Sequence, residues 1–87
     1  MMTAEAAAGL LSEALDDEAV CFERVQVGTG RAHGLALVVV SPDLVVWCDG
    51  QKFWWPAGWD TERQRTLYVS RRVTDLDEVV RWIAETR

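Results

Sequence analysis

Two thiols and one imidazole are the side chains in this sequence with the clearest catalytic potential. Cys21 or Cys48 could act as a nucleophile if His33 accepted its proton, because the thiolate is the reactive form. Both cysteines, however, lie in apolar runs typical of strands, and His33 lies in a glycine-rich segment. We therefore expect buried, free thiols that do not contact His33.

Other chemical sites find no support in the spacing of the residues. A structural zinc ion usually takes four Cys or His ligands, and the chain has three such residues in total. Carboxylate pairs for acid–base chemistry could come from Asp60 with Glu62 or from Glu23 with Asp49, and nothing singles out either pair. We predict no catalytic residue, no metal site and no cofactor site, and hence a protein that is not an enzyme.

Residues 28–34 read Gly-Thr-Gly-Arg-Ala-His-Gly and superficially suggest a phosphate-binding loop. The dinucleotide fingerprint G-x-G-x-x-G must be followed by a helix whose N-terminus faces the pyrophosphate. Here the third glycine is one position late, and the apolar run that follows is typical of a strand. The segment is interpreted as a hairpin connection.

Three of the five tryptophans, Trp54, Trp55 and Trp59, surround Pro56-Ala57-Gly58. Together they could form an aromatic wall for a small apolar or cationic ligand. A small-ligand-binding domain with its pocket around residues 54–59 is therefore an alternative function. Packing in the core or at an interface is the commoner role of tryptophan.

The elements that position these residues centre on a hairpin of strands 44–48 and 51–55, joined by Asp49-Gly50. A two-residue turn there pairs Trp47 with Lys52 and places the ammonium group near the Trp47 ring. One face of the hairpin then carries Leu44, Val46, Cys48, Phe53 and Trp55. The opposite face carries Val45, Trp47, Lys52 and Trp54. Both faces are apolar.

The rest of the chain predicts two helices and three more strands. A helix over 3–16, capped by Thr3, has an apolar stripe of Ala4, Ala7, Ala8, Leu11 and Leu15. Strands are expected at 21–27, 35–40 and 66–71, with a polar loop after 56–58 that carries Trp59. A helix capped by Thr74 has the stripe Leu76, Val79, Val80 and Ile83. The predicted fold is one α+β domain over residues 1–87: helix, five-stranded antiparallel meander, helix.

Two helices with one apolar stripe each can cover one face of this sheet and cannot readily cover both. Since the strands at 35–40, 44–48 and 51–55 are apolar on both faces, the second face needs another partner. We predict an interaction surface made of Val45, Trp47, Lys52, Trp54 and Trp59. A symmetric homodimer is the default form of such an interface. The alternative is one helix on each face, which leaves no surface for a partner.

Composition narrows the class of partner. The net charge of −5, from 14 acidic and 9 basic residues, argues against nucleic acid. Arg63, Arg65, Arg71 and Arg72 are interpreted as a solvated strand edge. No apolar segment reaches membrane-spanning length, and the acidic N-terminal sequence does not have the pattern of a signal peptide. We expect a cytoplasmic protein that binds no membrane, and the preference for Arg over Lys indicates a GC-rich, bacterial genome.

The order of elements is similar to that of small acidic adaptor and chaperone-like α+β proteins, such as bacterial secretion chaperones and toxin-neutralising immunity proteins. This resemblance concerns architecture alone, and it assigns no residue a role. It implies a non-enzymatic adaptor or chaperone-like interaction module, with an immunity-type inhibitor of a partner protein as an alternative.

Overall fold

The computed structural model describes residues 2–28 and 34–86 and contains the predicted succession of elements. Helix α1 (Ala4–Asp17) precedes five strands, and helix α2 (Leu76–Thr86) follows them through a short 3-10 turn, η2 (Val73–Asp75). The strands are β1 (Arg24–Val27), β2 (Ala36–Ser41), β3 (Leu44–Cys48), β4 (Lys52–Asp60) and β5 (Arg65–Arg72). They form one antiparallel sheet in the order β1-β2-β3-β4-β5, which confirms the predicted meander.

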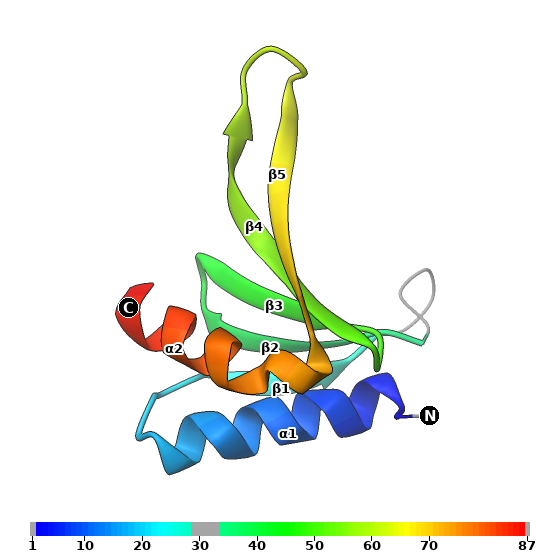
Figure 1. Cartoon of the computed structure of the whole chain (residues 1–87), viewed down its shortest axis with the longest axis vertical. Coiled ribbons are helices and arrows are strands. Elements are labelled where there is room, and N and C mark those ends of the chain that lie inside the picture. The colour runs from blue at the N-terminus through cyan, green and yellow to red at the C-terminus, as the bar shows by residue number, and fades with distance from the viewer. Residues whose placement is uncertain (1, 29–33, 87) are drawn as a thin grey trace.

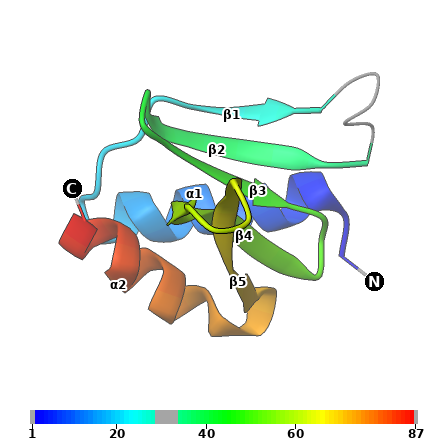
Figure 2. The same ribbon diagram turned by 90° about the horizontal axis from the view of Figure 1, so that it is seen from above.

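Both helices lie on the same face of the sheet, as predicted (Figures 1 and 2). Helix α1 packs under β1, β2 and β3, and α2 packs beside α1 and against β5. An ion pair between Arg71 Nε and Glu78 Oε2, 3.3 Å apart, joins β5 to α2 at the surface. The opposite sheet face is left without a helix among the described residues.

The core lies between the helices and the sheet. The stripe predicted for α1 is buried over its whole length, because its residues recur every three or four positions. The sheet contributes to this core the residues at alternate positions of its central strands: Ala36, Val38, Val40, Leu44, Val46, Cys48, Phe53 and Trp55. Val39 is also buried, at 6% exposure, but it lies on the opposite face. Val79, Val80 and Ile83 of α2 complete this core.

The two helices begin in different ways. Thr3 caps α1 as predicted, since its Oγ1 accepts a hydrogen bond from the Ala6 N–H at 3.1 Å. Thr74 was the predicted cap of α2, and this prediction is wrong. Thr74 lies inside η2, whose N-cap position is Arg72 and has no side-chain capping bond.

The β3–β4 turn is shifted by one residue from the predicted position. Trp47 pairs with Trp54 and Cys48 with Phe53, so that Gly50 and Gln51 occupy the turn. Asp49 Oδ1 accepts hydrogen bonds from the Gln51 and Lys52 N–H groups, at 2.9 and 3.1 Å. The shift moves each partner by two residues, and therefore every side chain keeps its predicted face.

Gly50 is at this turn for two physical reasons. Its φ of +97° is in the region that favours glycine, and a Cβ would collide with the carbonyl oxygen of Met2. The turn is therefore packed directly on the segment that leads into α1.

Strand β4 does not end at Pro56-Ala57-Gly58, contrary to the prediction. The strand pairs with β5 as far as Asp60, and the extra residue Ala57 is accommodated as a bulge between Pro56 and Gly58. Proline has no N–H to donate to β3, and no β3–β4 pairs follow Trp54 toward Pro56. Beyond that point β4 and β5 form a two-stranded arm, residues 56–60 and 65–68, which rises away from both helices (Figure 1).

Strand β1 is shorter and more exposed than predicted. It begins at Arg24, and all four of its residues are exposed, so it is an edge strand without a buried face. Cys21 lies before the strand and is exposed, whereas a buried thiol was predicted.

Candidate interaction surface

The sheet face that lies opposite the helices is the candidate site, and we call it the open face. Its apolar centre consists of six side chains at alternating positions of β2, β3, β4 and β5: Leu37, Val39, Val45, Trp47, Trp54 and Tyr68. Four of the five residues predicted for the interaction surface lie on this face of the layered body: Val45, Trp47, Lys52 and Trp54.

The pairing of the strands explains how the centre is built. Trp47 of β3 lies directly between Leu37 of β2 and Trp54 of β4. Side chains of directly paired residues share a face and lie in contact range, so these three form a continuous row across the sheet. Leu37, Trp47 and Trp54 are half-buried, because they shield one another while their outer surfaces stay accessible.

Polar residues surround the apolar centre. On the β1 side, Arg24 and Gln26 pair with Val39 and Leu37, and Arg24 Nη1 lies 3.6 Å from Glu23 Oε1. On the β5 side lie Ser70 and Arg72, the partners of Trp54 and Lys52. Apolar centre and polar border are the arrangement found in protein–protein interfaces.

Lys52 contacts a different ring from the predicted one. Its Nζ lies 5.8 Å from the centroid of Trp54, its neighbour two positions along β4, whereas the predicted turn placed it over Trp47. The change follows from the shifted β3–β4 turn, which pairs Trp47 with Trp54 instead of Lys52. A shallow hollow lined by Asp49, Lys52, Trp54, Tyr68 and Ser70 lies at this side.

Trp59, the fifth predicted residue, lies on the arm, 59% exposed. It pairs with Thr66, which shares a strand face with Tyr68 and Ser70. Because Ser70 pairs with Trp54, the Trp59 side chain projects to the same side as the open face. The prediction placed Trp59 in a loop, and the structure places it in a strand.

The predicted aromatic wall for a small ligand does not form. Trp55 points to the opposite side from Trp54 and is buried under α2, where its ring centroid lies 4.8 Å from that of Trp82. Trp59 stands apart on the arm. The three tryptophans therefore have three different environments.

The two thiols are far from equivalent. Cys48 is buried, and its single S–H group is shared between the carbonyl oxygens of Ala4 and Ala36, which lie 3.4 and 3.6 Å from Sγ. Burial, with a smaller contribution from the negative charge of Asp49, raises the pKa of Cys48 to about 11. A thiol with so high a pKa is a poor nucleophile at neutral pH. Cys21 is exposed, and His33 lies outside the described residues.

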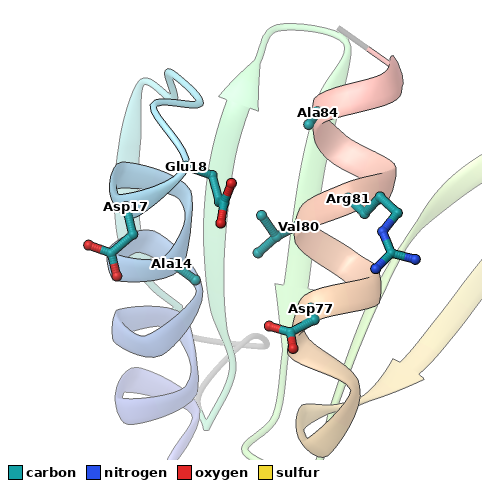
Figure 3. A pocket seen from close by; sticks show the side chains of 7 residues that line it. All are labelled: Ala14, Asp17, Glu18, Asp77, Val80, Arg81 and Ala84. Atoms are coloured by element: carbon teal, nitrogen blue, oxygen red, sulfur yellow. The ribbon is translucent and has the colours of Figure 1, made fainter.

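A second hollow lies between the C-terminal end of α1 and the side of α2 that faces it. Figure 3 shows Glu18 and Val80 entering it from opposite sides, with Asp77 nearby and Arg81 directed toward the far side of α2. Within residues 2–28 and 34–86, no three His, Cys, Asp or Glu side chains are grouped so as to hold a metal ion. The hollow has no buried polar group that would define a ligand.

Sequence reasoning missed three members of the open face: Leu37, Val39 and Tyr68. The signal for the first two was the run Leu35–Val40, apolar at every position, which requires two covered faces. Tyr68 alternates with the polar residues Thr66 and Ser70 along its strand, and only its register opposite Pro56 brings it beside the tryptophans.

Comparison of the chain with protein-family models, curated proteins and solved structures finds no match. Among the helices that the structure describes, none combines the length and apolar character needed to span a bilayer.

Proposed function

We propose that the protein is a non-enzymatic interaction module that works as a homodimer, with the open face as the contact between the two copies. The observation that carries the proposal is the unequal covering of the sheet. Two helices cover one face, while the other leaves partly exposed a row of aliphatic and indole side chains at Leu37, Val45, Trp47 and Trp54. Contiguous apolar surface of this kind marks interaction sites in soluble proteins.

The accessible surface of the chain supports this proposal quantitatively. A compact monomer of 9.8 kDa exposes about 5200 Å². The chain exposes 5926 Å², a surplus of about 700 Å² over that reference. Each partner in a stable protein complex buries about 800 Å². One interface of ordinary size would therefore remove the surplus.

The distribution of charge also favours contact through the sheet. Helices α1 and α2 and the turn η2 carry eight acidic residues and one basic residue, whereas the five strands carry five basic and one acidic. Contact between two open faces keeps the strongly acidic helical layers on the outside of the dimer. The negative charges of the two helical layers are then held far apart, where solvent and salt screen their repulsion.

The cytoplasmic location is part of the same proposal. Both cysteines are free, as is usual in a reducing compartment. In the adaptor or chaperone-like role that we propose, the dimer binds another protein through the surface that the dimer contact leaves free. The acidic helical layer is the most strongly charged surface available for such a contact.

A mixed-tag capture experiment tests the proposal. A tagged copy of the chain is expected to retain an untagged copy, and Val45→Asp in both copies is expected to abolish the retention. The reason is that dimerisation would bury the new carboxylate in the interface without a partner, which is unfavourable. The matched control is Val25→Asp, the same change at a 39% exposed valine that projects to the helix side of the edge strand β1.

The control variant should be retained like the unchanged chain. Failure of the unchanged chain to capture its untagged copy contradicts the homodimer, and equal loss with both aspartate variants contradicts the role of the open face. Circular dichroism of each variant checks that the fold is kept.

A further inference from the structure

The aromatic residues of the open face continue onto the arm as one stripe. From the body outward the stripe consists of Trp47, Trp54, Tyr68 and Trp59. Trp47 pairs with Trp54, Trp54 pairs with Ser70, and Tyr68 and Thr66 follow Ser70 at alternate positions of β5. Because Thr66 pairs with Trp59, all four aromatic side chains project to one side.

The bulge at Ala57 is what brings Trp59 into this stripe. Side chains alternate along a strand, so that Trp54 and Pro56 share a face and Trp59 would face the other side in a regular strand. One extra residue reverses the alternation, and Gly58 pairs with Leu67 while Trp59 pairs with Thr66. The bulge therefore turns the largest side chain of the arm toward the side of the open face.

The arm lacks the support that the rest of the sheet has. Beyond Trp55, β4 is paired with β5 alone, and the arm points away from the helical layer (Figure 1). Trp59, Leu67 and Tyr68 are 59%, 43% and 60% exposed. A two-stranded hairpin without packing on either face is marginally stable in water. The arm therefore has exposed apolar side chains that an external contact could bury, and such a contact would stabilise its hairpin.

We propose that the arm of each copy packs on the open face of the second copy, with Trp59 and Tyr68 against the row formed by Leu37, Trp47 and Trp54. This inference rests on the homodimer proposed above and specifies how its two copies meet. In a two-fold dimer the contact occurs twice, arm to face and face to arm. Any molecule that covers the open face also meets the arm, because the stripe is continuous.

A second copy fits this surface in both area and chemistry. The surplus accessible surface of about 700 Å² is close to one partner's share of a standard interface, and the exposed residues of the arm contribute to that surplus. Aromatic side chains from the arm would pack on the tryptophans of the face in edge or offset arrangements, the favoured geometries of aromatic pairs. The same side chains are the usual anchors of protein interfaces.

Hydroxyl-radical footprinting of the unchanged chain provides the first test. Trp59 and Tyr68 are expected to be oxidised rapidly in dilute solution and to become protected as the protein concentration rises through the dimerisation range. Arg63, at the turn of the arm, should keep the same reactivity throughout. Dimerisation without protection of Trp59 and Tyr68 would overturn the inference.

Variants of the arm provide the second test, with the dissociation constant of the dimer as the readout. Trp59→Ala and Tyr68→Ala are each expected to weaken the dimer at least about tenfold. The matched control is Leu67→Ala, which removes an exposed apolar side chain from the opposite side of the arm and should change the constant less than about threefold. Deletion of Ala57 should act like Trp59→Ala, because it turns Trp59 to the other side.

The outcomes separate this inference from the proposed function. If the unchanged chain is monomeric, the homodimer fails and the arm contact fails with it. If the dimer dissociates with Val45→Asp and is indifferent to Trp59→Ala, Tyr68→Ala and the deletion of Ala57, the open face stands as the interface and the arm contact is wrong.

Discussion

At the scale of single residues, Cys48 shows how burial determines chemistry. Its thiol is closed in between α1 and the sheet, where its Sγ donates to backbone carbonyl groups of Ala4 and Ala36. Only the neutral thiol can donate in this way, and a thiolate would lose its hydration and lie near the negative charge of Asp49. The residue therefore belongs to the packing of the core.

This environment predicts a dependence of stability on pH. The pKa of Cys48 is raised from 9.0 to about 11 in the folded chain. Below pH 9 both states hold the proton, and between pH 9 and about 11 the unfolded state loses it first. The free energy of unfolding should therefore fall with rising pH, by about 3 kcal/mol in total from this group.

Urea titrations of the unchanged chain and of Cys48→Ala from pH 7 upward measure the effect. The variant should be less stable at neutral pH and should show a shallower decline above pH 9, since all other titrating groups are common to both proteins. Parallel pH profiles would contradict the assigned burial of the thiol.

Gly50 and Gly9 make a matched pair for a second prediction. Gly50→Ala should destabilise the fold by at least about 2 kcal/mol, because the residue has positive φ and its Cβ would collide with Met2. Gly9→Ala, in the interior of α1 with open space at its Cβ, should stabilise by about 0.5–1 kcal/mol. Thermal unfolding monitors both, and an unchanged or raised melting temperature for Gly50→Ala would refute the assigned turn.

At the scale of elements, the apolar periodicity predicted most of what was found. The α1 stripe, the α2 stripe and the buried face of the central strands follow from apolar positions three to four apart in helices and two apart in strands. A shifted turn did not disturb the assignment of faces. Val45, Trp47, Lys52 and Trp54 therefore lie on the face to which their alternation assigned them.

The arm could not be predicted by the same reasoning. Pro56 and Gly58 normally interrupt strands, and here they remain in β4 because proline lies where β4 separates from β3 and the bulge absorbs Ala57. Because the bulge adds Ala57 to β4, simple alternation along the strand predicts the wrong side for Trp59. A bulge is a property of the pairing between two strands and leaves no periodic signal in either of them.

The contrast between the helix starts gives a prediction at this scale. Thr3→Ala removes the bond that the Ala6 N–H donates to Thr3 Oγ1 and should destabilise the chain by about 1 kcal/mol. Thr74→Ala, in η2, removes no capping bond and should change stability by less than about 0.5 kcal/mol. Chemical denaturation distinguishes the two, and equal effects would mean that Thr74 also serves as a cap.

At the scale of the whole molecule, the chain is a two-layer domain of helices and sheet, and the sheet face opposite the helices is uncovered. Its radius of gyration is 12.7 Å, against about 12 Å for a compact domain of this length. The arm accounts for the elongation, since it extends past the layered body (Figure 1). The acidic helical layer and the basic strands give the molecule two chemically different sides.

The central claim is that a second copy covers the open face, and sedimentation equilibrium tests it most directly. Over concentrations up to roughly 100 μM, the apparent mass of the unchanged chain should approach twice 9.8 kDa. Val45→Asp should sediment as a folded monomer, and Val25→Asp should sediment like the unchanged chain. A mass of 9.8 kDa at every concentration would contradict the claim.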